Sequence, residues 1–178
     1  MTTAADVVSF WKEAGPSKWF RKDAAFDAAF RNRFLAAHER AAKGELDHWR
    51  QTAAGALALL ILLDQFPRNC FRGTARMFAT DAKAKALAAD AIELGHDQAT
   101  DENLRSFFYL PFEHSEELAD QQRAVALTEP LGGESHRYAL IHLDVIERFG
   151  RFPHRNDVLG RASTPEEIAF LKAGGFAG

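Results

Sequence analysis

Residues 59–76 read LLILLDQFPRNCFRGTAR, a run in which continuous apolar residues end in an aspartate and three arginines. The apolar part reaches back to residue 53, so a helix here would be apolar on every face and would need neighbours all round it. It covers only about half of the roughly 20 residues needed to span a bilayer. The sequence therefore predicts a buried central helix that begins near Asp47 and is ended by Pro67, which lacks a backbone donor.

A second polar turn is similar to the first. Residues 150–161, GRFPHRNDVLGR, repeat its Phe-Pro, Arg-Asn and Gly-Arg elements. Arginine carries a planar fork of donors that suits carboxylates and phosphates. A cleft for an anionic ligand and an internal network of ion pairs need the same side chains, and the sequence leaves both open. The candidate ligand-binding residues of the two turns are Asp64, Arg68, Asn69, Arg72, Arg76, Arg151, His154, Arg155 and Asn156.

The chain as a whole has 178 residues, 47% hydrophobic content and a net charge of −3. We expect one domain over residues 1–178. This charge does not indicate the basic surface of a nucleic-acid-binding protein or a polybasic segment that binds membranes. The single cysteine, Cys70, cannot form an intrachain disulfide, and residues 1–15 do not have the pattern of a signal peptide. We therefore expect a soluble cytoplasmic protein.

Almost every segment has helical periodicity, and no run alternates apolar and polar residues long enough for a strand. The connections are short, which favours antiparallel neighbours. The sequence predicts an all-α fold of about eight helices, arranged as antiparallel hairpins around the central helix. The expected helices cover 4–14, 23–43, 47–66, 80–95 and 100–110, with one starting at 115, one over 135–149 and one over 164–173.

Aromatic residues indicate how the first helices pack. Phe26, Phe30 and Phe34 follow one another at a spacing of four, which places them on one face of the helix over 23–43. We interpret this row as a packing ridge. Trp19 and Phe20 precede that helix, and their size predicts that the connecting loop folds onto the core.

His142 lies at the centre of an apolar arc on the helix over 135–149, so it should point inward. A core histidine and a pocket histidine both fit, the second because the polar RFPHRN turn follows directly. His142, His154 and His114 are the candidates for acid or base catalysis. The residues of the arc are Tyr138, Ala139, Val145, Ile146 and Phe149.

Asp64 shares an apolar arc of the central helix, and burial of a lone carboxylate costs several kcal/mol. It therefore needs a cation, for which Arg68, Arg72 and Arg155 are the candidates. In one interpretation the pair is structural. In the other, Asp64 orients an arginine whose other side holds an anionic ligand, and the two polar turns are neighbours.

Residues 111–120, PFEHSEELAD, supply acidic groups and complete the candidate ligand-binding set with Glu113 and His114. Glu113, His114 and Glu117 have spacings that could place metal ligands on one helix face. Acids are also common in the first turn of a helix. We expect Glu113 or Glu117 to pair with an arginine, and no metal. The phosphate-loop, dinucleotide, Gly-x-Ser-x-Gly and His-Glu-x-x-His motifs are all absent from the sequence.

On these residues the chain resembles a mainly bacterial family catalogued as domain of unknown function 924, whose fold is similar to tetratricopeptide-repeat (TPR) stacks. The resemblance runs from VVSFW, residues 7–11, to EEIAFL, residues 166–171. It implies a right-handed TPR-like array, and no established reaction, cofactor or catalytic residue. The TPR signature of about 34 residues is not found in the sequence. The most specific segments are LLDQFPRNCFRGTARMFATD (62–81), YLPFEHSEELADQQ (109–122) and RFGRFPHRNDVLGRASTPEE (148–167).

Two functions from different classes fit this sequence. In the first, the arginine-rich turns, the YLPFEHSE segment and His142 line a polar cleft that binds a small anionic molecule, a phosphate or a carboxylate. In the alternative, the stack is an interaction module for a protein or peptide, and the polar residues are internal fasteners. Whether there is catalysis, and with which cofactor, is left open.

Overall fold

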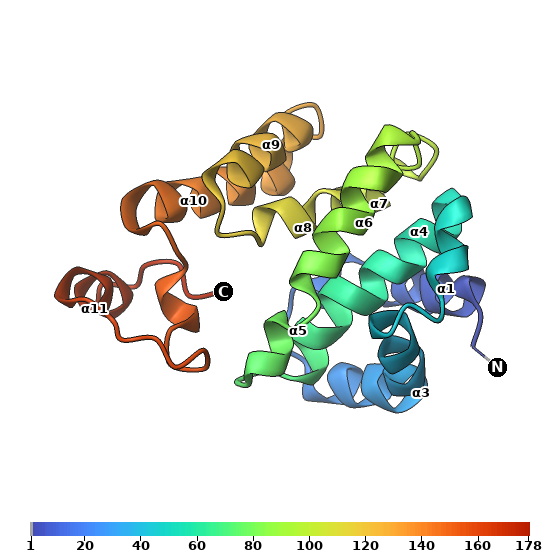
Figure 1. The fold of residues 1–178 in the computed structure, drawn as a ribbon, viewed down its shortest axis with the longest axis horizontal. Coiled ribbons are helices and arrows are strands. Elements are labelled where there is room, and N and C mark those ends of the chain that lie inside the picture. Colours follow the sequence, from blue (N-terminus) through green and yellow to red (C-terminus); the bar gives the residue numbers. More distant parts are fainter. Residues whose placement is uncertain (1) are drawn as a thin grey trace. The chain divides into compact units, whose positions relative to one another are not determined.

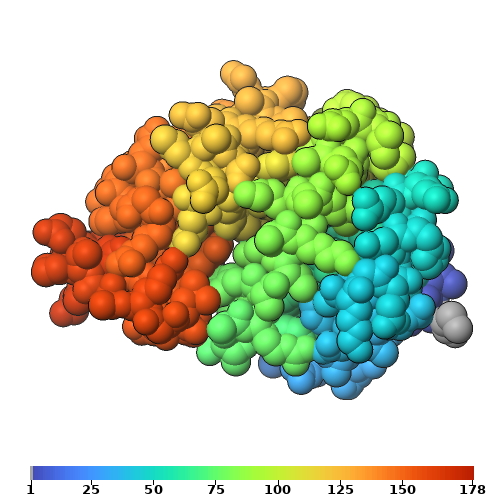
Figure 2. Space-filling model, in the orientation of Figure 1, coloured from blue at the N-terminus to red at the C-terminus, as the bar shows by residue number. Residues whose placement is uncertain are grey.

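The computed structural model describes residues 2–178, and the chain divides into two compact units, drawn as a ribbon in Figure 1 and with all side chains in Figure 2. The first unit runs up to Arg72 and from Arg76 to Phe108; the second contains Gly73–Ala75 and Tyr109–Gly178. Residues 2–178 contain no strand, which confirms the all-α class. The TPR-like array and the single domain stay predictions.

The first unit is built around one long helix. Its elements are α1 (Ala4–Ala14), α2 (Pro16–Trp19), α3 (Ala24–Ala42), η1 (Asp47–Gln51), α4 (Ala53–Leu60), η2 (Ile61–Gln65), α5 (Phe66–Cys70), η3 (Ala75–Phe78, whose Ala75 is counted with the second unit), α6 (Asp81–Glu93), α7 (Glu102–Arg105) and η4 (Ser106–Phe108).

The central helix consists of α4, η2 and α5 in direct succession, and it packs against α1, α3 and α6. Thr52 caps its start, because the hydroxyl oxygen accepts a hydrogen bond from the amide of Gly55 at 3.1 Å. Every residue over 55–67 is buried. The predicted central helix is therefore confirmed, and its neighbours surround it as an all-apolar helix requires.

Both ends of this helix differ from the prediction. Asp47 lies in the separate short helix η1, and Pro67 does not end the central helix, which continues to Cys70. At Pro67 the difference arises in η2, a π-helical turn in which the amide of Phe66 donates to the carbonyl oxygen of Ile61. A π turn shifts the hydrogen-bond register by one residue, and such turns accommodate local breaks in a helix.

Side chains from neighbouring elements bond the carbonyl groups in front of Pro67. Nδ1 of His38 in α3 lies 2.8 Å from the carbonyl oxygen of Leu62, and the hydroxyl of Thr80 donates to that of Leu63. These bonds satisfy acceptors near a residue that has no amide hydrogen to donate. Tertiary contacts thus let the helix pass through a proline.

The aromatic ridge of α3 is confirmed. Phe26, Phe30 and Phe34 are buried, and the ring of Phe10 from α1 lies 5.4, 5.4 and 5.2 Å from their ring centroids. Of the two aromatic residues before α3, only Trp19 folds onto the core. Phe20 is 67% exposed, so the prediction for it was wrong.

The helix predicted over 100–110 is broken into α7, η4 and α8 (Leu110–Glu113). Phe107, Phe108 and Tyr109 are all buried, and three consecutive residues cannot face one side of an α-helix. Pro111 lies in the first turn of α8, where its missing donor costs least.

The second unit is a helical hairpin followed by a compact C-terminal part. Helix α9 packs on α10 and α8, and α11 lies against η5. Its small apolar core contains Val145, Ile146 and Phe152, flanked by three partly buried phenylalanines. The elements after α8 are α9 (Leu118–Thr128), α10 (Gly133–Phe149), η5 (Pro153–Arg155) and α11 (Pro165–Lys172).

Local start and stop signals acted largely as expected in this unit. Thr164 and Glu167 form the predicted capping box of α11, and Gly150 ends α10 in the left-handed region at φ 66°. Helix α9 begins at Leu118, later than predicted. The hydroxyl of Ser115 still accepts a hydrogen bond from the backbone at Glu117, in a turn that precedes the helix. None of the helices over residues 2–178 is long and apolar enough to cross a membrane.

Candidate functional site

Arg68 is the centre of the first polar turn. Its guanidinium binds both carboxylate oxygens of Asp81, at 2.8 and 3.0 Å, and Nη1 lies 3.3 Å from Oδ1 of Asp64. Asp64 is only 1% exposed, which confirms that it is buried with a cation beside it. Burial opposes the charge of Arg68, but the two carboxylates outweigh it and raise the pKa of the guanidinium.

The other candidates of this turn bind carboxylates on α3. Asn69 and Arg72 both donate to Asp27, at 2.8 and 3.0 Å, and Arg76 forms an ion pair with Glu39. These contacts join the end of the central helix to α3. In the first unit these residues of the polar turn are therefore paired with carboxylates of α3.

Arg151 is the corresponding fastener in the second unit. It donates to both oxygens of Glu167 at 2.6 and 2.9 Å, and Glu167 is 2% exposed. Glu167 also accepts hydrogen bonds from the amide of Thr164 and from Asn156. The bonds from Arg151, followed by the backbone bond at Thr164, lower the pKa of Glu167 to about 2.

Arg161 ends the second polar turn, and the sequence suggests it as a residue that a binding site would need. It holds Glu116 through bonds of 2.7 and 3.0 Å, and Glu116 also accepts the amide of Phe152 at 2.8 Å. Burial alone would raise the pKa of Glu116, but Arg161 and the Phe152 amide outweigh it and the pKa is lowered. The expected pairing of Glu113 or Glu117 with an arginine stays a prediction, and Glu116 between them is the carboxylate that Arg161 binds.

A different pair forms between α8 and α10. Nδ1 of His142 lies 3.1 Å from Oε1 of Glu113 and 2.8 Å from the carbonyl oxygen of Tyr138. Both neighbours of Nδ1 are acceptors, which assigns the proton of the neutral ring to Nδ1 and leaves the lone pair on Nε2. His142 points inward as predicted, although Tyr138 of the expected arc is 42% exposed.

The surroundings of His142 keep it uncharged. Burial first, and then the positive charge of His114 and Arg155, lower the pKa of His142 to about 3. His142 is therefore a neutral base at neutral pH, with its ring orientation set by two hydrogen-bond acceptors.

The second unit gathers five of the sequence candidates around Phe152, and we name them the histidine cluster. Arg155 is 6% exposed, donates to the carbonyl oxygen of His114 at 3.0 Å and lies 4.5 Å above the Phe152 ring. The ring of His142 lies 6.2 Å from that of His114 and 5.5 Å from that of Phe152. The cluster consists of Glu113, His114, His142, His154 and Arg155.

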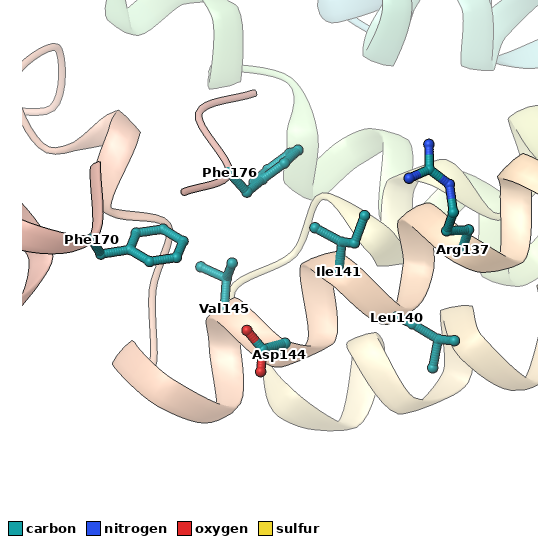
Figure 3. A pocket seen from close by; sticks show the side chains of 7 residues that line it. All are labelled: Arg137, Leu140, Ile141, Asp144, Val145, Phe170 and Phe176. Carbon is teal, nitrogen blue, oxygen red and sulfur yellow. The ribbon is translucent and has the colours of Figure 1, made fainter. Parts of the chain in front are cut away.

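An open apolar groove runs beside α10, with a volume of about 360 Å³. Figure 3 shows that Phe170 and Phe176, from the C-terminal part of the chain, lie on the same side of α10 as Ile141 and Val145. Sequence reasoning missed this groove. The only signal was Leu140 and Ile141, apolar residues outside the predicted inward arc. The groove is lined by Arg137, Leu140, Ile141, Asp144, Val145, Phe170 and Phe176.

The remaining candidates do not form a metal or thiol site. Among residues 2–178 there is no group of three or more His, Cys, Asp or Glu side chains that could hold a metal ion. Burial raises the pKa of Cys70 to about 12, so its thiol stays protonated and is a poor nucleophile. The prediction that the two polar turns share one cleft stays a prediction, because they belong to different units.

The fold and these contacts define an all-α protein whose arginine-rich turns are braced by carboxylates. The chain belongs to the family described as bacterial protein of unknown function (DUF924), whose model matches residues 7–175. It is similar to the solved structure of a protein of unknown function from Agrobacterium tumefaciens, with 60% sequence identity and a TM-score of 0.95. That similarity covers 96% of this chain and 97% of the other. None of the curated proteins matches the chain.

Proposed function

We propose that the second unit binds a small anionic ligand, a carboxylate or a phosphate, at the histidine cluster. The observation that carries this proposal is the convergence of Arg155, His114 and His154 on the buried ring of His142. Burial is the largest cause of the lowered pKa of His142, and the charges of His114, Arg155 and His154 lower it further; the same charges would attract an anion.

The proposal narrows the site that the sequence suggested. Arg68, Arg72 and Arg76 bind carboxylates of the first unit, and Arg151 and Arg161 bind carboxylates of the second. The proposal places the ligand at Arg155, because Arg155 lies among the titratable rings of His114, His142 and His154.

His142 has the role of proton acceptor in this proposal. Glu113 and the carbonyl of Tyr138 fix the ring through Nδ1, so a ligand proton would be taken up at Nε2. An anion near the ring favours the imidazolium form and raises the pKa of His142. Binding should therefore be accompanied by proton uptake, which calorimetry in buffers of different ionisation enthalpy measures directly.

Thermal melts against phosphate and citrate test the binding. The wild type should be stabilised, by about 2.7 kcal/mol at a hundredfold excess over the dissociation constant. Arg155→Gln should lose this stabilisation. The matched control Arg161→Gln, in the same turn, should be less stable without ligand because Glu116 loses its partner, yet keep the ligand effect.

Two results would overturn the proposal: a wild type that neither anion stabilises, or an Arg155→Gln protein that retains the full stabilisation. If Arg155→Gln does not fold, His154→Gln takes its place in the same comparison. A protein that no anion stabilises would favour the alternative, a TPR-like interaction module. That alternative is supported by the arginine–carboxylate pairs, which fasten the helix ends in both units.

A further inference from the structure

Phe176 contacts both the open groove and the histidine cluster. It lines the groove, and its ring centroid lies 4.3 Å from that of His142 and 5.4 Å from that of His154. The residue belongs to the C-terminal segment that follows α11. One side chain from the end of the chain thus separates an exposed apolar surface from a buried neutral histidine.

The groove beside α10 is open to solvent and mainly apolar. Its volume of about 360 Å³ falls within the range of roughly 300–1,000 Å³ that is usual for such sites. Ile141, Val145 and Phe170 provide apolar walls, as Figure 3 shows. An apolar group of a ligand that binds at such a surface is removed from water, and this transfer is favourable.

We propose that the ligand is amphiphilic, with a carboxylate or phosphate admitted to the histidine cluster when Phe176 moves aside and an apolar chain lying in the groove. This inference rests on the proposed anion-binding function and names the class of ligand for that site. The inference rests on the position of Phe176, which lines the groove and also contacts His142 of the histidine cluster.

The movement of Phe176 explains why the charged and apolar parts should belong to one molecule. The ring packs against His142 and Phe152, so its displacement uncovers apolar surface. A small hydrophilic anion would leave that surface in water. A ligand with an attached apolar chain covers it again, while Arg155 and His154 attract the charged end.

Calorimetric titration of the full chain with butanoate, hexanoate, octanoate and octan-1-ol tests this inference. Full burial of one methylene corresponds to about a fourfold gain in affinity, so octanoate should bind at least about tenfold tighter than butanoate even with partial burial. Octan-1-ol, which has the chain without the charge, should bind more weakly than octanoate.

Two variants on α10 test where the apolar chain of the ligand binds. Ile141→Asn places an amide in the groove and should remove most of the gain in affinity with chain length. Leu143→Asn is the matched control, because Leu143 is also partly buried on α10 but does not line the groove, and it should keep the gain. Circular dichroism confirms that each variant is folded, and the wild-type series stands if one is not.

The outcomes separate the inference from the function on which it rests. Equal affinities for butanoate and octanoate, or equal losses in the two variants, would overturn the inference; stabilisation by phosphate that depends on Arg155 would then leave the proposed function standing. If octan-1-ol binds as tightly as octanoate, the groove binds the apolar chain without help from the histidine cluster. That result would also overturn the inference. No binding of any anion, phosphate included, would overturn both.

Discussion

The side chains of Glu113 and His142 meet at 3.1 Å, Oε1 to Nδ1, with only 4% and 8% of their surfaces exposed. A pair this close would normally favour the charged imidazolium. Here burial and the neighbouring positive charges keep the pKa of His142 at about 3. The ring is therefore held in one orientation without being protonated, with its lone pair on Nε2.

This state of His142 predicts a pH dependence of stability. The unfolded ring has a pKa near 6.5 and the folded ring near 3, so in this window the unfolded chain binds more protons. The His142 contribution should be fully present above about pH 6.5 and be lost as the pH falls towards 3. His142→Asn should flatten the urea-denaturation midpoint across this window, and nitrogen-detected NMR should show a neutral Nδ1–H ring from about pH 8 to about pH 5. An imidazolium signal in that range would contradict the assignment.

Glu167 predicts a second window at lower pH. Arg151 and the Thr164 amide lower the pKa of its carboxyl from 4.5 to about 2, so its stabilisation is present above pH 4.5 and lost as the pH falls towards 2. Glu167→Gln should remove this acid sensitivity and lower stability at neutral pH. The neighbouring Glu166→Gln, at an exposed position, should do neither, and equal acid profiles for the two variants would refute the assignment.

The two arginines at opposite ends of the first polar turn should differ in their contribution to stability. Arg68→Ala removes a cation that pairs with both Asp81 and Asp64, a carboxylate that is 1% exposed, and should cost about 3 to 5 kcal/mol. Arg76→Ala breaks an ion pair whose partners are 51% and 43% exposed, and should cost less than about 1 kcal/mol. Urea denaturation measures both. Equal costs would show that burial does not determine the strength of these pairs.

Phe176 should control access to His142. Phe176→Ala removes the ring that lies 4.3 Å from His142, and carbethoxylation of His142 by diethyl pyrocarbonate should become at least several times faster. Phe170→Ala is the control: Phe170 lines the same groove but packs on Phe149, at 5.0 Å. Peptide mapping by mass spectrometry identifies the modified ring. The same rate in both variants would show that Phe176 does not shield His142.

The sequence by itself determined the helical class, the buried central helix and most helix starts. These features depend on residues a few positions apart. The period of Phe26, Phe30 and Phe34 buries one face of α3, and the Thr164–Glu167 box caps α11 without help from elsewhere. The inward direction of His142 also followed from the residues of its own helix.

The tertiary structure decided how the polar residues are paired. The sequence selected the members of the histidine cluster, because charged groups beside apolar runs need partners. It did not identify Glu116 as the partner of Arg161, or Asp81 and Asp27 as those of Arg68 and Arg72. Long, flexible side chains bind whichever carboxylate another element brings within reach.

The tertiary structure also decided that the central helix continues through Pro67. A proline normally ends a helix, and that rule gave the wrong boundary here. His38 and Thr80 bond the carbonyl groups of Leu62 and Leu63 in front of it, from elements distant in the sequence. Phe176 reaches His142 in the same way. Local patterns fix where a chain forms helices, whereas hydrogen-bond and ring partners depend on distances that exist only once the helices have packed.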